Sequence, residues 1–89
     1  MKTYKLEVFG KVQGVYFRQS TQQYCTQNGI VGQVCNKPDG SVEIIAKGPI
    51  ESLEKLVEWA KVGPPRAVVN KTIVEEIPDQ AFTRFSIVR

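Results

Sequence analysis

The sequence predicts an α+β fold in which one antiparallel sheet of four to five strands carries two helices on a single face. Three observations lead to this expectation. Apolar residues alternate with period two in several short segments, and they recur at helical spacing in two longer ones. These segments follow one another as strand, helix, strand, strand, helix, strand. This order is the split βαβ, or ferredoxin-like, arrangement.

The first part of the chain supplies one strand and one helix. Residues 4–12 alternate between apolar and polar side chains, which predicts a half-buried strand. Residues 17–28 change to helical spacing, with side chains that face the sheet at i, i+4, i+7 and i+8 from Phe17. Asn28 and Gly29 then end the helix, because both tolerate the left-handed conformation of a C-cap.

The remainder completes the sheet and adds the second helix. Residues 31–37 and 41–47 are predicted strands joined by a Pro-Asp-Gly turn, in which proline fixes φ and glycine accepts a positive φ. Residues 50–60 carry an apolar stripe that ends at Gly-Pro-Pro. Residues 68–74 are a β-branched strand with unclear alternation, which either a bulge or an exposed face would explain. Residues 82–88 supply a short last strand.

Composition limits the classes of function. The 89 residues fit one domain over 1–89, and a hydrophobic share of 42% suits a globular core. No apolar run approaches the roughly 20 residues of a membrane span, and no signal-peptide pattern is present, so we expect a cytoplasmic protein with no membrane partner. The chain has no histidine, which excludes histidine triads and most zinc hydrolases. We expect neither a metal nor a cofactor.

The charge of the chain and its aromatic content limit the kinds of molecule that it is expected to bind. The formal net charge of +3 modestly favours anionic ligands, but the basic residues are scattered, so we expect no nucleic-acid partner. RNA recognition in this topology needs aromatic side chains on the central strands, and residues 41–47 contain none.

The two cysteines are expected on different sides of the sheet. Cys25 is expected at the helix–sheet interface and Cys35 on the opposite side of the sheet. A disulfide between them would have to cross the sheet, so both should be free thiols.

The junction of the first strand and first helix is one candidate site. Residues 10–18 read GKVQGVYFR, a glycine-containing loop that runs into a helix N-terminus, where unpaired N–H groups and the helix dipole favour an anion. The dipole disfavours a cation in the first turn, so Arg18 calls for an anionic partner that its planar fork can grip. On these residues alone, an ordinary turn with a solvated arginine is an equal alternative.

Asn36, at the end of the predicted second strand, is the other candidate. If Val34 faces the core, Asn36 shares its face beside the hairpin, and the split βαβ topology places this strand close to the first. Its carboxamide can hold a water through the carbonyl oxygen and donate through the NH₂ group. A polar residue that merely precedes a turn is the commoner case on sequence alone.

Taken together, the two segments resemble the acylphosphatase family. Residues 10–18 resemble its signature loop. Asn36 followed by DGSVE at residues 39–43 resembles its second signature, at the expected distance downstream. The resemblance extends over nearly the whole chain, including Gly48 and GPPRA at residues 63–67.

The resemblance implies a metal-free enzyme that hydrolyses acyl phosphates. Arg18 and Asn36 would be its catalytic residues, the first binding the phosphate and the second positioning the attacking water. The implied phosphate-binding loop consists of Gln13, Gly14, Val15, Tyr16, Phe17 and Arg18. The ligands would be a small acyl phosphate as substrate and phosphate or sulfate as competitor, and we expect a monomer. A carboxylate leaving group, whose conjugate acid has a pKa of about 4, needs no general acid.

One departure from the family pattern and one alternative function remain at this point. Cys35 stands where similar sequences usually carry Arg or Lys, and Lys37 and Lys11 would then replace part of the missing charge. The alternative is a non-catalytic anion-binding module, like the acylphosphatase-like domains of larger enzymes that handle carbamoyl phosphate. Nothing in the sequence predicts a pocket for the acyl group.

Overall fold

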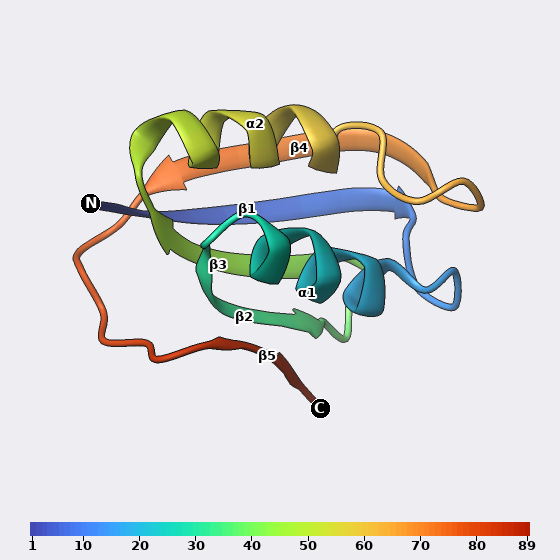
Figure 1. The fold of residues 1–89 in the computed structure, drawn as a ribbon. Coiled ribbons are helices and arrows are strands. Elements are labelled where there is room, and N and C mark those ends of the chain that lie inside the picture. The colour runs from blue at the N-terminus through green and yellow to red at the C-terminus, as the bar shows by residue number, and fades with distance from the viewer.

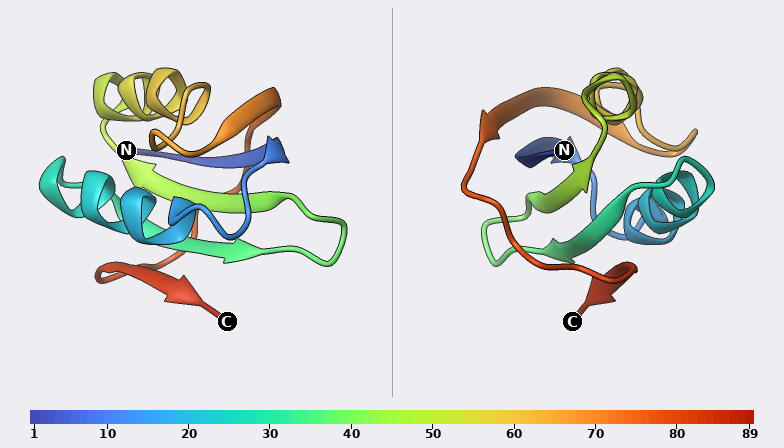
Figure 2. Two further views of the ribbon diagram at one scale, coloured as in Figure 1. Left: turned by 90° about the vertical axis from the view of Figure 1, so that its right-hand side faces the viewer. Right: turned by 60° about the vertical axis from the view of Figure 1, so that its left-hand side comes forward.

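The computed structural model describes all 89 residues as a five-stranded sheet with both helices on one face (Figures 1 and 2). The elements in chain order are β1 Lys2–Lys11, α1 Phe17–Gln27, β2 Val31–Asn36, β3 Val42–Gly48, α2 Ile50–Ala60, β4 Val68–Glu76 and β5 Phe85–Val88. The strands lie in the order β4-β1-β3-β2-β5. Helix α1 packs mainly over β2 and β5, and α2 over β1, β3 and β4.

The predicted ferredoxin-like fold class is confirmed, with a difference at one edge of the sheet. β1 pairs antiparallel with β3 and β4, and β2 pairs antiparallel with β3. β5 instead runs parallel to β2, so the sheet is mixed rather than wholly antiparallel. The reason is the path of residues 77–84, which carry the chain from the end of β4 to the start of β2 (Figure 1).

The bulge expected in the fourth strand is present. Phe9 pairs with Lys71 and Gly10 with Val69, which leaves Asn70 of β4 without a partner on β1. A bulge of this kind bends the strand pair and increases its twist. Gly10 has φ 130°, and a Cβ at this position would collide with the backbone of β4. Only glycine therefore fits at this bulged position of β1, just before the loop of residues 12–16.

The core lies between the sheet and the two helices. Fifteen buried apolar side chains form one cluster there. β1 contributes Leu6 and Val8, and α1 contributes Phe17 and Cys25 on the face that their spacing predicts. Complete burial of such a side chain contributes about 1.5 to 3 kcal/mol for the larger apolar types. The cluster therefore holds the first turn of α1 firmly on the sheet.

The ring of Phe17 fixes the start of α1 from the side of α2. It meets the ring of Trp59 edge to face at a centroid distance of 5.7 Å, and Trp59 stacks on Tyr24 at 5.1 Å. Gly63, with φ 72°, lies directly against Phe17, and a Cβ there would be 2.6 Å from Phe17 Cε2. The turn after α2 therefore packs closely against the first residue of α1.

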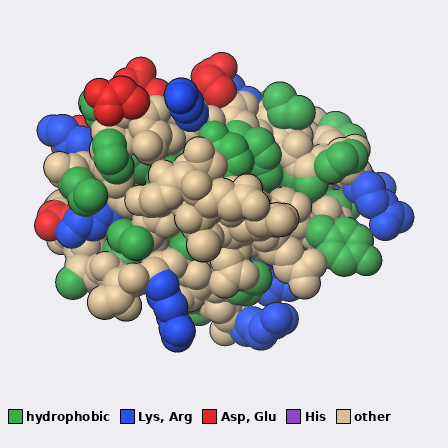
Figure 3. All heavy atoms as spheres, viewed as in Figure 1, with side chains coloured by type: hydrophobic (Ala, Val, Ile, Leu, Met, Phe, Trp, Pro, Cys, Tyr) green, Lys and Arg blue, Asp and Glu red, His purple; other side chains and the backbone are tan.

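The surface on the helix side carries charges of both signs. Lys and Arg side chains are spread around the rim of this face, and Asp and Glu side chains lie mainly toward α2 (Figure 3). This face therefore has no continuous basic strip of the kind that nucleic-acid binding uses. Neither helix has the length and apolar character that crossing a membrane requires.

Candidate functional site

A cavity of about 320 Å³ opens where the loop after β1, the start of α1, the end of β2 and the end of β5 meet. Its lining consists of Val12, Gly14, Tyr16, Phe17, Arg18, Gln19, Asn36, Ile87 and Arg89. The volume falls at the lower end of the range of about 300 to 1,000 Å³ that is typical of small-molecule sites. Arg18 and Asn36, the two residues singled out in the sequence, thus lie in one cavity.

The loop before α1 leaves the amide groups of the first turn without helical partners. The first intrahelical bond runs from the Ser20 N–H to the Tyr16 carbonyl at 3.0 Å, so the preceding N–H groups have no such acceptor. No side chain caps this end, and the first turn contains no acidic residue. Tyr16 has φ 63° and is the only non-glycine residue with positive φ. The helix therefore presents bare N–H groups and the positive end of its dipole to the cavity.

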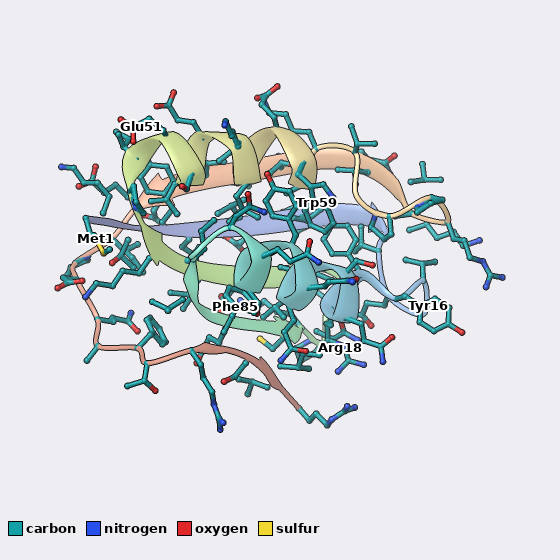
Figure 4. The ribbon with its side chains drawn as sticks, in the orientation of Figure 1. Met1, Tyr16, Arg18, Glu51, Trp59 and Phe85 are labelled. Carbon is teal, nitrogen blue, oxygen red and sulfur yellow. The ribbon has the colours of Figure 1, made fainter.

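Arg18, the second residue of α1, adds a full positive charge beside these amides. Its side chain lies below the first turn of α1, between that helix and the C-terminal end of the chain (Figure 4). None of the ion pairs in the structure includes Arg18. The guanidinium is therefore available to an anion, which it can bind with two parallel hydrogen bonds.

Asn36 reaches the cavity from the opposite wall. It is the last residue of β2, and side-chain alternation along this strand places it on the same face as the fully buried Val34. Its side-chain oxygen Oδ1 is buried and has no hydrogen-bond partner in the protein. Buried polar atoms are rarely left in this state, because each one forfeits its hydrogen bond to water. The oxygen is an acceptor that a donor inside the cavity can satisfy.

Two members of the predicted phosphate-binding loop have side chains that do not line the cavity. Val15 is buried in the core. Gln13 donates from Nε2 to the carbonyl oxygens of Lys37 and Ser41, at 2.9 Å each. These two bonds tie the loop to the β2–β3 turn that begins directly after Asn36. Gln13 therefore sets the position of the loop relative to Asn36.

The turn after Asn36 is held by its own hydrogen bonds. Asp39 Oδ1 accepts from the Ser41 amide at 2.9 Å and from the Ser41 hydroxyl at 2.6 Å, which holds the pKa of Asp39 below its ordinary value. Lys37 donates to Glu43 at 3.3 Å, and this contact raises the pKa of Lys37. Lys37 is thus paired with a carboxylate on the neighbouring strand.

Both cysteines are free thiols, as the sequence predicts. Burial raises the pKa of Cys25 to about 12. Burial and then the Glu43 carboxylate raise the pKa of Cys35, while Lys37 and Arg18 act in the opposite direction. Cys35 pairs with Glu43 across β2 and β3 and lies on the other face of the sheet from Asn36. Both thiols therefore stay protonated at neutral pH, and neither lines the cavity.

Sequence reasoning missed four residues of the cavity, Val12, Gln19, Ile87 and Arg89. Val12 and Gln19 directly flank the predicted loop. Ile87 and Arg89 come from the segment predicted only as a short last strand, and their position depends on the parallel pairing of β5 with β2. Their alternation at the end of that strand was the one available signal. No group of three or more His, Cys, Asp or Glu side chains lies together in a way that could hold a metal ion.

Comparison with known proteins agrees with this geometry. The acylphosphatase family model matches residues 4–87. A curated acylphosphatase from Marinobacter nauticus is 51% identical over 81 residues, which cover 90% of this chain and 88% of that protein. The crystal structure of acylphosphatase from Bacillus subtilis is 40% identical and superposes with a TM-score of 0.95 over 100% of both chains.

A larger protein contains a similar unit. Full-length HypF, solved in a phosphate- and nucleotide-bound form, matches 99% of this chain with 12% of its own, at a TM-score of 0.92 and 26% identity. The relatives of similar length are themselves acylphosphatases, which favours the enzyme over a non-catalytic module. The chain therefore belongs to the acylphosphatase family and hydrolyses the carboxyl–phosphate bond of acyl phosphates.

Proposed function

We propose that the cavity is the active site, in which Arg18 and the amides of the loop at residues 13–18 bind the phosphoryl group and Asn36 positions the attacking water. The observation that carries this assignment is the buried, unpartnered Oδ1 of Asn36 in the cavity that Arg18 also lines. An unsatisfied buried acceptor costs about 1 to 3 kcal/mol. A water that donates to this oxygen removes that cost and is held facing the phosphoryl group.

Binding of the substrate uses charges that are already in place. The phosphoryl oxygens accept hydrogen bonds from the first-turn amides of α1 and two from the fork of Arg18. The amide donors are held in place by the packing of Phe17 and by the hydrogen bonds of Gln13 before any substrate arrives. Because they need no reorganisation, they stabilise the charge that builds on the phosphoryl oxygens in the transition state.

The reaction balances without a protonating side chain. The water oxygen held by Asn36 bonds to phosphorus, and the bond from phosphorus to the acyl oxygen breaks. The electron pair of that bond leaves with the acyl oxygen, giving a carboxylate. Both protons of the water depart on the phosphate product. The weak basicity of the carboxylate, with a conjugate-acid pKa of about 4, explains how a site without histidine suffices.

We further propose that residues 1–89 work as one monomeric domain in the cytoplasm, with inorganic phosphate as a product and competing ligand. Every group in the proposed mechanism comes from one chain. HypF, the larger relative of which 12% matches this chain, was solved in a phosphate- and nucleotide-bound form, which is a reason to test phosphate as a ligand here.

Inhibition by anions tests this assignment. We expect inorganic phosphate and sulfate to compete with benzoyl phosphate, because they occupy the same amides and the same arginine fork. Initial rates followed by ultraviolet absorbance should show a raised KM and an unchanged kcat. Dialysis against EDTA should leave kcat unchanged, because Arg18 and the amides supply the positive charge. Noncompetitive inhibition, or activity that EDTA removes and Mg²⁺ or Zn²⁺ restores, would place the chemistry elsewhere.

The cysteines provide a second expectation. A variant with Cys25→Ala and Cys35→Ser should keep kcat/KM for benzoyl phosphate within about twofold, because neither thiol lines the cavity. Removing the buried sulfur of Cys25 should lower the free energy of unfolding by about 1 kcal/mol. Denaturant unfolding measures the second quantity on the same sample. Inactivation of the native protein by thiol alkylation, at full retention of structure, would contradict this expectation.

A further inference from the structure

The cavity extends beyond the groups that the proposed mechanism uses. Phosphate and water engage the first turn of α1 and Asn36, whereas Ile87 and Arg89 line the same cavity from the C-terminal segment. Neither residue belongs to the two sequence motifs. The volume of about 320 Å³ is more than a phosphoryl group alone fills, so part of it is left for the acyl group.

Strand register explains why these two side chains face the cavity. In the parallel pair of β2 and β5, Val34 lies opposite Ile87 and Cys35 lies opposite Val88. One residue further along both strands, Arg89 comes level with Asn36. Because side chains alternate between the faces of a sheet, Ile87 and Arg89 lie on the face that Asn36 occupies and that α1 covers.

The charged side chains that line this cavity are all of one sign. Arg18 and Arg89 are the only lining residues with a charged side chain, and no Asp or Glu is among the others. Arg89, like Arg18, takes part in none of the ion pairs of the structure. The phosphoryl group accounts for Arg18, which leaves the guanidinium of Arg89 without an assigned partner. Ile87 supplies an apolar surface next to it.

We propose that Ile87 and Arg89 form an acyl subsite, and that Arg89 selects acyl phosphates whose acyl group carries a second negative charge, such as a dicarboxylic acid phosphorylated on one carboxyl group. Ile87 contacts the carbon skeleton, and the fork of Arg89 pairs with the distal carboxylate. This inference rests on the proposed function, because the subsite is defined relative to a phosphoryl group at Arg18. Arg89 is exposed, so water screens the pair and the expected preference is about three- to fivefold.

Matched substrates test the charge alone. Carboxybenzoyl phosphate and carbamoylbenzoyl phosphate have nearly the same shape, but only the first carries the extra negative charge. The 3- and 4-substituted isomers of each place the group in two directions. We expect kcat/KM to favour the carboxylate by about three- to fivefold in at least one isomer pair. Arg89→Gln should remove this preference and leave kcat/KM for the carboxamide within about twofold.

Arg84→Gln is the control, because it removes the same charge from the C-terminal segment but lines a different cavity. It should keep the preference. The proposal is wrong if the wild type shows no preference, if Arg89→Gln retains it, or if Arg89→Gln slows both substrates equally, which would make Arg89 a phosphate ligand. If the proposed function itself were wrong, the result would differ from all of these, because Arg18→Ala would then still hydrolyse the carboxamide substrate.

Discussion

Replacing Arg18 with alanine is expected to abolish turnover and phosphate binding together. Its guanidinium faces the cavity without a carboxylate partner, and it is proposed to contact phosphate in both the ground state and the transition state. Loss of one preorganised group of this kind lowers the rate by about a hundredfold to a thousandfold. Loss of charge-assisted hydrogen bonds should weaken phosphate binding at least tenfold, or about 1.4 kcal/mol. Benzoyl phosphate absorbance and calorimetry with inorganic phosphate measure the two effects on one preparation.

Two control variants separate charge from geometry. Arg18→Lys keeps a positive charge but lacks the planar fork, so it should restore part of the phosphate affinity and little of the rate. Arg84→Ala removes an arginine that does not line the cavity, and it should change neither quantity. If Arg18→Ala still bound phosphate like the wild type, the anion site would have to lie away from the N-terminus of α1.

Asn36→Ala should instead lower the rate and spare the affinity. Its Oδ1 is proposed to hold the water and not the phosphate, so kcat should fall by about a hundredfold while the dissociation constant for phosphate stays within about twofold. The pairing of β2 with β3 uses backbone groups, so the substitution leaves the strand in place. The same absorbance and calorimetric measurements distinguish this pattern from that of Arg18→Ala.

Gln33→Ala is the matched control on the same strand. Gln33 lies next to Val34 and therefore faces away from the cavity, so both the rate and the affinity should be unchanged. Loss of phosphate affinity in Asn36→Ala as severe as in Arg18→Ala would make Asn36 a phosphate ligand or a structural residue. Full activity in Asn36→Ala would refute the mechanism in which Arg18 binds the phosphoryl group and Asn36 positions the water.

Local patterns predicted most of the fold because short-range physics dictates them. Alternation places Leu6 and Val8 in the core, and helical spacing places Phe17 and Cys25 there. The direction of β5, in contrast, could not be predicted from local patterns. A four-residue strand has the same alternation whether it runs parallel or antiparallel to its neighbour, and its direction depends on the path of residues 77–84 across the end of the sheet.

The site was predictable to the extent that each residue has a local reason for its place. Arg18 stands in a first helical turn where a cation is unfavourable, and Asn36 stands on a core-facing position of a strand. The contribution of Gln13 was not predictable in the same way, because its two acceptors lie 24 and 28 residues further along the chain. Arg89 depends in addition on the register of β5.

Because of the strand order, the proposed active site is complete only after the non-local strands have paired. The first turn of α1, the end of β2 and the residues after β5 meet only when β1 has paired with β3 and β5 has paired with β2. Such non-local pairings must overcome loop-closure entropy before they gain any contact energy, and they form slowly. In a refolding experiment, helical circular dichroism should therefore return before hydrolysis does. The delay between the return of circular dichroism and the return of hydrolysis then gives the time that the last strands need to dock.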